Sequence, residues 1–299
     1  MRQAKNVASL IDLGERVMND STHVFEDHDH RQEAEELLAL CLKIELDELD
    51  DLYEPAARIR ERYLSMVARR AGGEPLPFIT GHIEFYGLDL EVRPGAFVPR
   101  PSSELTVDRA ARRLRKRQSP IVVDVCTGAG PIALALGDEF PDAEVWGTDI
   151  LEEGLAQGRR NAKHLGISNV TLKKGDMYDG LPARLRGSVD VITGHVPYVP
   201  VDEIKDLPSE VKEFEPVHTL SDGAPGDGLH LMRKAVNEAR EWLRPGGWLL
   251  LEVSDDTTPK VKKLVRKAGL TDVGVSSDGD ELSEVVEARL EAAGKSKPR

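Results

Sequence analysis

The stretch IVVDVCTGAGPIAL, residues 121–134, decides the fold that we expect for this chain. Its first five residues are rich in β-branched side chains and predict a buried strand. Gly128 and Gly130 then form a turn, and Pro131 stands where the first turn of a helix favours proline. A flexible turn between a strand and a helix lets a ligand approach the helix amino terminus closely. We therefore expect this stretch to open a ligand-binding α/β domain.

The same alternation of short apolar runs and helical stretches continues along the chain. Strands separated by helices predict a parallel sheet with right-handed crossovers, whose ligand lies at the carboxyl ends of the strands. The expected strands span 121–125, 143–149, 169–176, 189–195, 248–253, 272–278 and 283–290, and the expected helices begin at 131 or span 151–164 and 227–243.

The residues before this domain have a different pattern of apolar, polar and turn-forming residues. Amphipathic helices are expected at 31–43 and 55–70, so residues 1–73 form a small helical domain. Proline and glycine punctuate residues 74–100, which predicts a β-hairpin linker. Residues 101–290 then form the ligand-binding domain, and 291–299 a disordered tail.

The basic run 109–117 is interpreted as the solvated face of a helix whose Ala110, Ala111 and Leu114 point inward.

Composition and charge exclude several classes of protein. The chain has 299 residues and a formal net charge of −13, which argues against binding a nucleic-acid phosphate backbone. Cys41 and Cys126 have no metal-ligand spacing, and His28 and His30 are interpreted as a solvated helix start, so no metal is expected. No apolar run is long enough for a membrane span. We expect a cytoplasmic monomer that binds a protein or a small molecule.

The glycine turn alone leaves two cofactors open. Gly128, Gly130 and Ala133 fit the G-x-G-x-x-A pattern of nicotinamide dinucleotide sites, and Asp149 could bind ribose hydroxyls in either case. S-adenosylmethionine (SAM) is favoured by Asp176, which offers a carboxylate to an adenine amine. The polar turn HVPY, residues 195–198, also suits a methyl acceptor better than a nicotinamide.

Several sequence blocks occur together in an order that resembles a known family. They are EPLPFITGHIEFYGLDLEVRPGAFVPRPSSE, DVCTGAGPIALAL, GHVPYVP, FEPVHTLSDGAPGDGLHLMRKAV and LRPGGWLLLEV. The chain resembles the HemK-type release-factor glutamine methyltransferases over nearly its whole length. The resemblance implies a class I methyltransferase fold, with a mostly parallel seven-stranded sheet and an antiparallel edge hairpin. It also implies SAM-dependent methylation of the side-chain amide of the glutamine in the Gly-Gly-Gln loop of peptide-chain release factors.

The resemblance also implies roles for individual residues. Residues 126–130 would meet the methionine part of SAM, Asp149 the ribose, and Asp176 with Met177 the adenine. The full cofactor set is Asp124, Cys126, Thr127, Gly128, Gly130, Asp149, Ile150, Asp176, Met177 and His195. The acceptor set is Arg100, Glu104, His195, Val196, Pro197 and Tyr198, of which His195, Pro197 and Tyr198 are the expected catalytic residues.

The acceptor motif departs from the family's Asn-Pro-Pro-Tyr at His195 and Val196. An asparagine carbonyl and a backbone carbonyl can accept both hydrogens of a glutamine amide, whereas neutral imidazole has only one acceptor nitrogen. His195 could orient the amide, act as a base toward another acceptor, or only cap its strand. Tyr198 would form an aromatic wall. Cys126 replaces the first loop glycine, and EVSDDT lacks the family's usual Gly and Gln after the glutamate.

Three further hypotheses stay open beside glutamine methylation. One is a SAM-dependent enzyme for a small molecule with His195 as base, and another is a noncatalytic SAM-binding protein. A dehydrogenase is the last.

Overall fold

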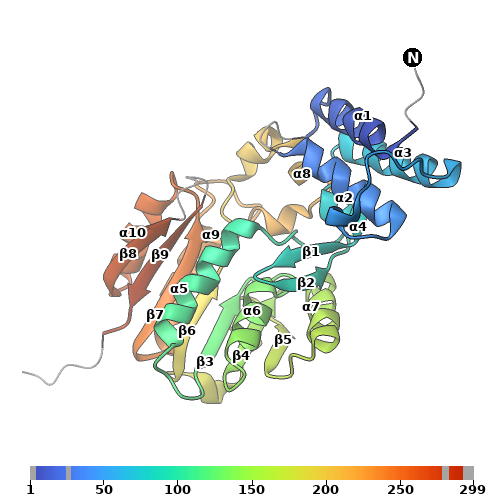
Figure 1. Cartoon of the computed structure of the whole chain (residues 1–299). Helices are drawn as coiled ribbons and strands as arrows, with labels where there is room; N and C mark the ends of the chain where they lie inside the picture. The colour runs from blue at the N-terminus through green and yellow to red at the C-terminus, as the bar shows by residue number, and fades with distance from the viewer. Residues whose placement is uncertain (1–4, 25–27, 278–282, 292–299) are drawn as a thin grey trace, which may run out of the picture. The chain divides into compact units, whose positions relative to one another are not determined.

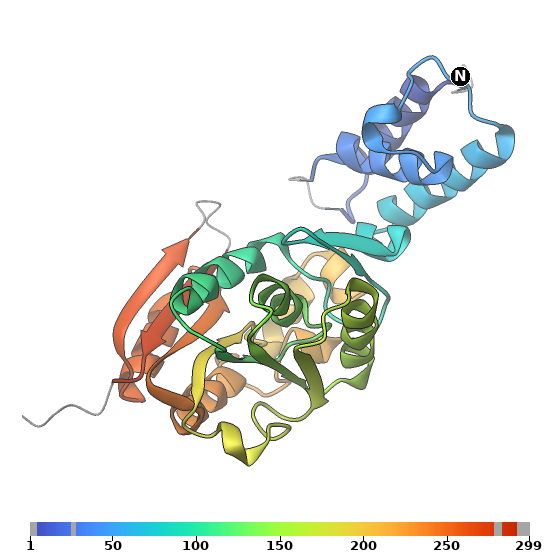
Figure 2. The ribbon, with the colours of Figure 1, turned by 60° about the horizontal axis from the view of Figure 1, so that its bottom comes forward.

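The computed structural model describes residues 5–24, 28–277 and 283–291. The chain forms two compact units (Figures 1 and 2). Unit 1 comprises Met1–His82, Val92–Pro94 and Lys205–Glu215, and unit 2 comprises Ile83–Glu91, Gly95–Ile204 and Pro216–Arg299. Unit 1 thus takes up a segment that lies more than a hundred residues beyond its helices in the sequence. The expected tail lies outside the described residues except for Glu291.

Unit 1 is a helical cluster around a small apolar core. Leu10, Leu37, Leu38, Tyr63 and Val67 are buried where three helices meet. Spacing of apolar residues at three and four positions puts them on the facing sides of the helices. The elements are α1 (Val7–Asn19), α2 (His30–Leu42), η1 (Leu46–Glu48), α3 (Ala57–Ala71), α4 (Leu76–Thr80) and α8 (Ser209–Lys212).

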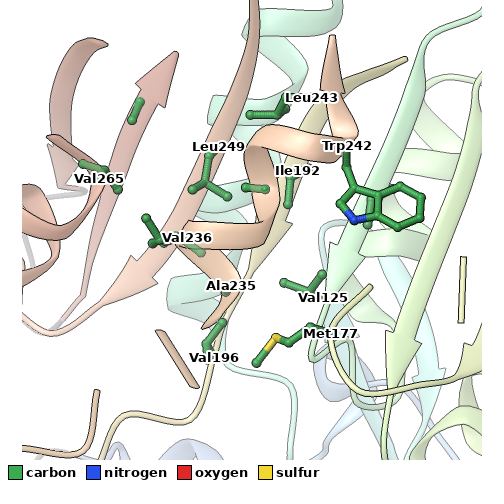
Figure 3. Close-up of a cluster of buried hydrophobic side chains, with 14 of the residues drawn as sticks. Val125, Met177, Ile192, Val196, Ala235, Val236, Trp242, Leu243, Leu249 and Val265 are labelled. Atoms are coloured by element: carbon green, nitrogen blue, oxygen red, sulfur yellow. The ribbon is translucent and has the colours of Figure 1, made fainter. Parts of the chain in front are cut away.

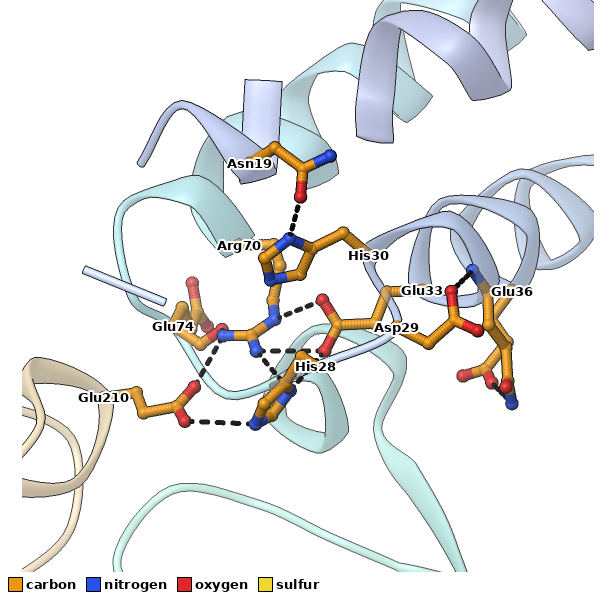
Figure 4. A network of polar contacts seen from close by, with 10 residues as sticks. Asn19, His28, Asp29, His30, Glu33, Glu36, Arg70, Glu74 and Glu210 are labelled. Carbon is orange, nitrogen blue, oxygen red and sulfur yellow. Dashed lines mark hydrogen bonds and ion pairs between the residues drawn. The ribbon is translucent and has the colours of Figure 1, made fainter. Parts of the chain in front are cut away.

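A buried arginine joins the two distant parts of unit 1 (Figure 4). Arg70 is fully buried and donates to both Glu33 oxygens at 2.9 Å and to Glu210 of α8 at 2.7 Å. Burial alone would raise the pKa of Glu33, but hydrogen bonds from His28 and Arg70 lower it. The prediction of a solvated start for α2 is wrong for His30, which is buried with its Nδ1 2.7 Å from Oδ1 of Asn19. His28 is exposed, as predicted, and contacts Glu33.

Unit 2 contains the predicted seven-stranded sheet. Its order is β5-β4-β3-β6-β7-β9-β8, with the first five strands parallel and β9 antiparallel to both neighbours. The α/β fold with an antiparallel edge is therefore confirmed. The strands are β3 (Ile121–Val125), β4 (Glu144–Asp149), β5 (Val170–Lys174), β6 (Val189–Gly194), β7 (Leu243–Val253), β8 (Thr271–Ser277) and β9 (Glu284–Arg289).

Helices cover both faces of this sheet, which explains why most residues of its central strands are apolar (Figure 1). Val122 and Val191 belong to an apolar cluster with residues of α5 and α6. Val123 and Ile192 belong to a second cluster with residues of α9 and α10, in which Figure 3 labels Ile192. The helices are α5 (Glu104–Leu114), α6 (Pro131–Glu139), α7 (Glu152–Leu165), α9 (His230–Trp242) and α10 (Thr258–Lys267), with short turns η2 (Pro101–Ser103), η3 (Ala183–Leu185), η4 (Val201–Asp206) and η5 (Val217–Thr219).

The region 74–100 contains a helix in addition to the predicted hairpin. It contains the short helix α4 as well as a hairpin of β1 (His82–Phe85) and β2 (Leu88–Glu91). Pro75 is the N-cap of α4, and Pro77 lies in its first turn, where the fixed φ of proline suits a helix start. The basic run behaves as expected on its inner side, where Ala110, Ala111 and Leu114 are buried.

Candidate active site

Four residues with ionisable side chains lie in a row at the carboxyl edge of the sheet. Val125 pairs with Thr148 and with Gly194, and Gly194 pairs with Leu251. The next residue on each strand is therefore Asp149, Cys126, His195 or Glu252, in the order β4-β3-β6-β7. Neighbouring strands lie roughly 5 Å apart. The register thus places the predicted cofactor turn beside the predicted acceptor turn.

The turn after β3 has the backbone that a ligand cradle needs. Cys126, Gly128 and Gly130 all have positive φ, at 54°, 56° and 76°. A Cβ at Gly128 would meet nothing within 4 Å, so open space borders the backbone there. Behind the turn, a Cβ at Gly158 of α7 would lie 2.5 Å from the Ala129 carbonyl oxygen. The absence of a side chain at Gly158 lets α7 support the turn from below, and sequence reasoning missed this residue.

Asp149 holds the turn at the end of β4. Its Oδ2 accepts from the Gly128 N–H and its Oδ1 from the Leu151 N–H, both at 2.8 Å. Burial raises the pKa of Asp149, and these backbone hydrogen bonds lower it in part. A carboxylate has about four lone-pair positions, so ribose hydroxyls could still donate to it. Asp149 can both shape the turn and bind a ligand.

Asp124 lies beneath the turn rather than at its surface. Its side chain accepts hydrogen bonds from Thr127 at 2.5 Å and from Thr193 at 2.7 Å, and the residue is 1% exposed. Burial raises its pKa to about 6. These contacts tie β3 to β6 and to the turn, so the structure gives Asp124 and Thr127 a supporting position in the cradle.

The predicted adenine region is split between an exposed and a buried residue. The Asp176 carboxylate is exposed and pairs with Lys234 of α9 at 2.5 Å. Met177 is buried, has φ of 55°, and its sulfur lies 3.8 Å from that of Cys126. Ile150 is 49% exposed beside Asp149. The two polarisable sulfur atoms of Cys126 and Met177 offer a contact surface for a ligand at the turn. Asp176 could bind the adenine amine only while it is also paired with Lys234.

The acceptor turn places His195 between two aromatic rings. Phe97 meets the imidazole edge to face at a centroid distance of 5.4 Å, and Tyr198 stacks on it at 6.0 Å. The Arg100 guanidinium lies over the Phe97 ring, 4.5 Å from its centroid. Burial raises the pKa of Tyr198. These rings hold the histidine in one plane, and Phe97 was not among the predicted site residues.

The remaining predicted acceptor residues occupy different positions. Val196 is fully buried in the core, and Pro197 is half-buried in the turn. Glu104 begins α5 and accepts from the Tyr86 N–H at 2.8 Å, which ties the hairpin to the helix. Its role toward an acceptor stays a prediction.

Sequence reasoning also missed Glu252, the last member of the row. It is 1% exposed, and its Oε2 lies 3.5 Å from Nδ1 of His195. The signal for it was the single carboxylate in the apolar run WLLLEV, because a buried charge requires partners.

Two kinds of structure are absent from the described part of the chain. None of its helices is long and apolar enough to cross a membrane. Nor do the described residues contain a cluster of His, Cys, Asp and Glu side chains that could hold a metal ion.

Comparison with known sequences decides which cofactor and chemistry this site serves. A methyltransferase domain model matches residues 117–289. The release factor glutamine methyltransferase of Streptomyces coelicolor is 39% identical over 75% of this chain and 78% of its own. That of Moorella thermoacetica is 38% identical over 80% and 83%. The chain belongs to the release factor glutamine methyltransferase family.

Solved structures agree on the fold of this family member. A methyltransferase from Pyrococcus furiosus has a TM-score of 0.51 at 22% identity and covers 69% of this chain and 90% of its own. A Thermus thermophilus 16S rRNA N2 G1207 methyltransferase, solved with SAM and guanosine, has a TM-score of 0.53 at 19% identity over 70% and 50%. At these identities the likeness concerns the fold alone.

Family membership confirms SAM as the cofactor and rules out the dehydrogenase hypothesis. The turn fits this cofactor, because open space borders Gly128 and the Asp149 carboxylate stands beside it. His195 and Val196 stand in the predicted acceptor turn of this family member, at the positions where the sequence resemblance implies Asn and Pro.

Proposed function

We propose that this chain methylates the side-chain amide nitrogen of the glutamine in the Gly-Gly-Gln loop of a peptide-chain release factor. The observation that carries the proposal is the row Asp149, Cys126, His195 and Glu252 at one edge of the sheet. It puts the only imidazole of the row next to the cofactor turn. Family membership supplies the acceptor class.

The cofactor would lie along the carboxyl ends of β3, β4 and β5. Asp149 would bind the ribose, the backbone from Cys126 to Gly130 the methionine part, and Met177 a face of the adenine. SAM, when bound, supplies a methyl group on a positively charged sulfur. The protein's task is then to hold the acceptor nitrogen in line with the S–CH3 bond.

The acceptor turn would hold the glutamine side chain. Phe97 and Tyr198 flank His195 and offer apolar faces for the glutamine methylenes. A hydrogen-bond acceptor near the amide orients its lone pair toward the methyl group. We expect a protein substrate that meets the enzyme in the cytoplasm.

Peptide mass mapping of a purified bacterial release factor tests this function. After incubation with the protein and SAM, a methyl group is expected on the loop glutamine, and a release factor with that glutamine changed to alanine is the control. His195→Asn, which restores the family residue, should also methylate the loop. SAM binding without methylation by either protein would overturn the proposal.

A further inference from the structure

Glu252 is a buried carboxylate whose hydrogen-bond donors are hydroxyl groups. Ser102 and Ser283 donate to its Oε1 at 3.1 and 3.0 Å, and Thr106 donates to its Oε2 at 3.4 Å. Within the described residues, no lysine or arginine pairs with it. A buried carboxylate without a fixed cation attracts a hydrogen-bond donor or a positive charge placed beside it.

The nearest candidate for that proton is Nδ1 of His195. This atom is buried 3.5 Å from Oε2 and has no hydrogen-bond partner within the described chain. A buried polar atom without a partner costs free energy. A hydrogen on Nδ1, donated to Glu252, would satisfy both groups. The distance is long for a hydrogen bond, as is common at active sites before the substrate binds.

We propose that Glu252 is a positioning residue that holds neutral His195 in the tautomer with its hydrogen on Nδ1. This inference rests on the proposed function and deepens it. Nε2, across the ring, then carries the lone pair and accepts a hydrogen from the substrate glutamine amide. In this tautomer, Nε2 of histidine accepts the hydrogen bond that the resemblance assigns to the family's asparagine carbonyl.

In the same arrangement, His195 can accept the proton that the reaction releases. As the N–CH3 bond forms, the S–CH3 bond breaks and its electron pair returns to sulfur, and the amide nitrogen loses a hydrogen ion to Nε2. The ring becomes a cation beside the Glu252 carboxylate, and it later releases the proton to solvent. Because 22% of the His195 side chain is exposed, water can reach the ring.

Glu252→Gln is a sharp test because its effect on the tautomer can be derived. The two serine hydroxyls point at Oε1, so the glutamine oxygen is expected there and its NH2 group beside His195. The NH2 group donates to Nδ1, which moves the ring hydrogen to Nε2. Nε2 then becomes a donor and loses its function as the acceptor.

Nitrogen-15 NMR of histidine-labelled protein measures the tautomer without any substrate. The chain has 8 histidines, and the His195 signals are identified by their loss in His195→Asn. At a pH where the ring is neutral, the chemical shift of an unprotonated nitrogen is expected at Nε2, and in Glu252→Gln at Nδ1. Glu241→Gln, at an exposed site, should change nothing. An unprotonated Nδ1 in the unmodified protein overturns the proposal.

A kinetic cycle separates positioning from a merely structural role. Glu252→Gln should lower kcat for release-factor methylation at least about tenfold when residue 195 is histidine. It should change kcat less than about twofold in the His195→Asn background, because asparagine has no tautomer. Equal losses in both backgrounds overturn the proposal. If no variant methylates the loop, the proposed function fails, while the NMR result still decides the tautomer.

Discussion

Two buried glutamates on neighbouring strands have hydrogen-bond donors of different charge. Glu252 on β7 and Glu287 on β9 are each 1% exposed. Glu287 accepts hydrogen bonds from Arg109 at 2.7 Å, from Arg113 at 2.7 and 2.9 Å and from the Ser276 hydroxyl at 3.0 Å. The described partners of Glu252 are three hydroxyl donors and a histidine. Two guanidinium groups compensate the charge of Glu287, which makes it a structural residue. The hydroxyls around Glu252 leave its charge available to His195.

The largest expected effect on stability follows from Glu287→Gln. Removing one member of a buried ion pair leaves the remaining charges without compensation, and we expect the free energy of unfolding to fall by about 3 to 5 kcal/mol. Denaturant unfolding followed by circular dichroism measures it. Glu241→Gln is the matched control, because its pair with Arg186 is exposed and should contribute nothing measurable. Equal small losses at both positions would contradict the structural role of Glu287.

Asp124 extends the comparison to a carboxylate that has only hydroxyl donors. Burial raises its pKa from 3.8 to about 6, so the folded protein binds the proton more tightly than the unfolded chain. The contribution of Asp124 to stability is therefore greatest below about pH 4 and is lost as the pH rises to about 6, by about 3 kcal/mol. Asp124→Asn should remove this part of the slope. Parallel stability curves for the two proteins over that range would show that the pKa is not raised.

Glu252→Gln should affect stability much less than Glu287→Gln does. No guanidinium loses its partner, and the amide can still accept from the serines and donate to His195, so we expect a change of at most about 1 kcal/mol. The same unfolding experiment measures it. A loss as large as that of Glu287→Gln would make Glu252 a structural residue.

A small effect is also expected for Arg109→Ala. Arg113 would still neutralise Glu287, and Arg109 is partly exposed, so the unfolding free energy should fall by about 0.5 to 1 kcal/mol. Arg113→Ala should cost more, because its guanidinium also lies 3.6 Å from the Trp248 ring centroid. The double variant should lose more than the sum of the two. Additive losses would mean that the arginines act independently.

The sequence predicted the parts of the molecule that depend on local patterns. Apolar runs such as 121–125 and the glycine turn after them determine strands, helices and the edge where ligands bind. Glu252 could not be assigned a role in this way, because Ser102 is 150 positions away from it. Arg70 and Glu210 are likewise 140 positions apart. Pairings of this kind depend on tertiary packing, which no local pattern encodes.

The Arg70 network also constrains how this protein can evolve. Segment 205–215 belongs to unit 1 although it is encoded after the acceptor turn. A recombination event that exchanged only the amino-terminal helices between relatives would separate Arg70 from Glu210 and bury an incompletely paired cation. The two stretches should therefore be inherited together. Positions 70 and 210 are expected to change in concert across the family.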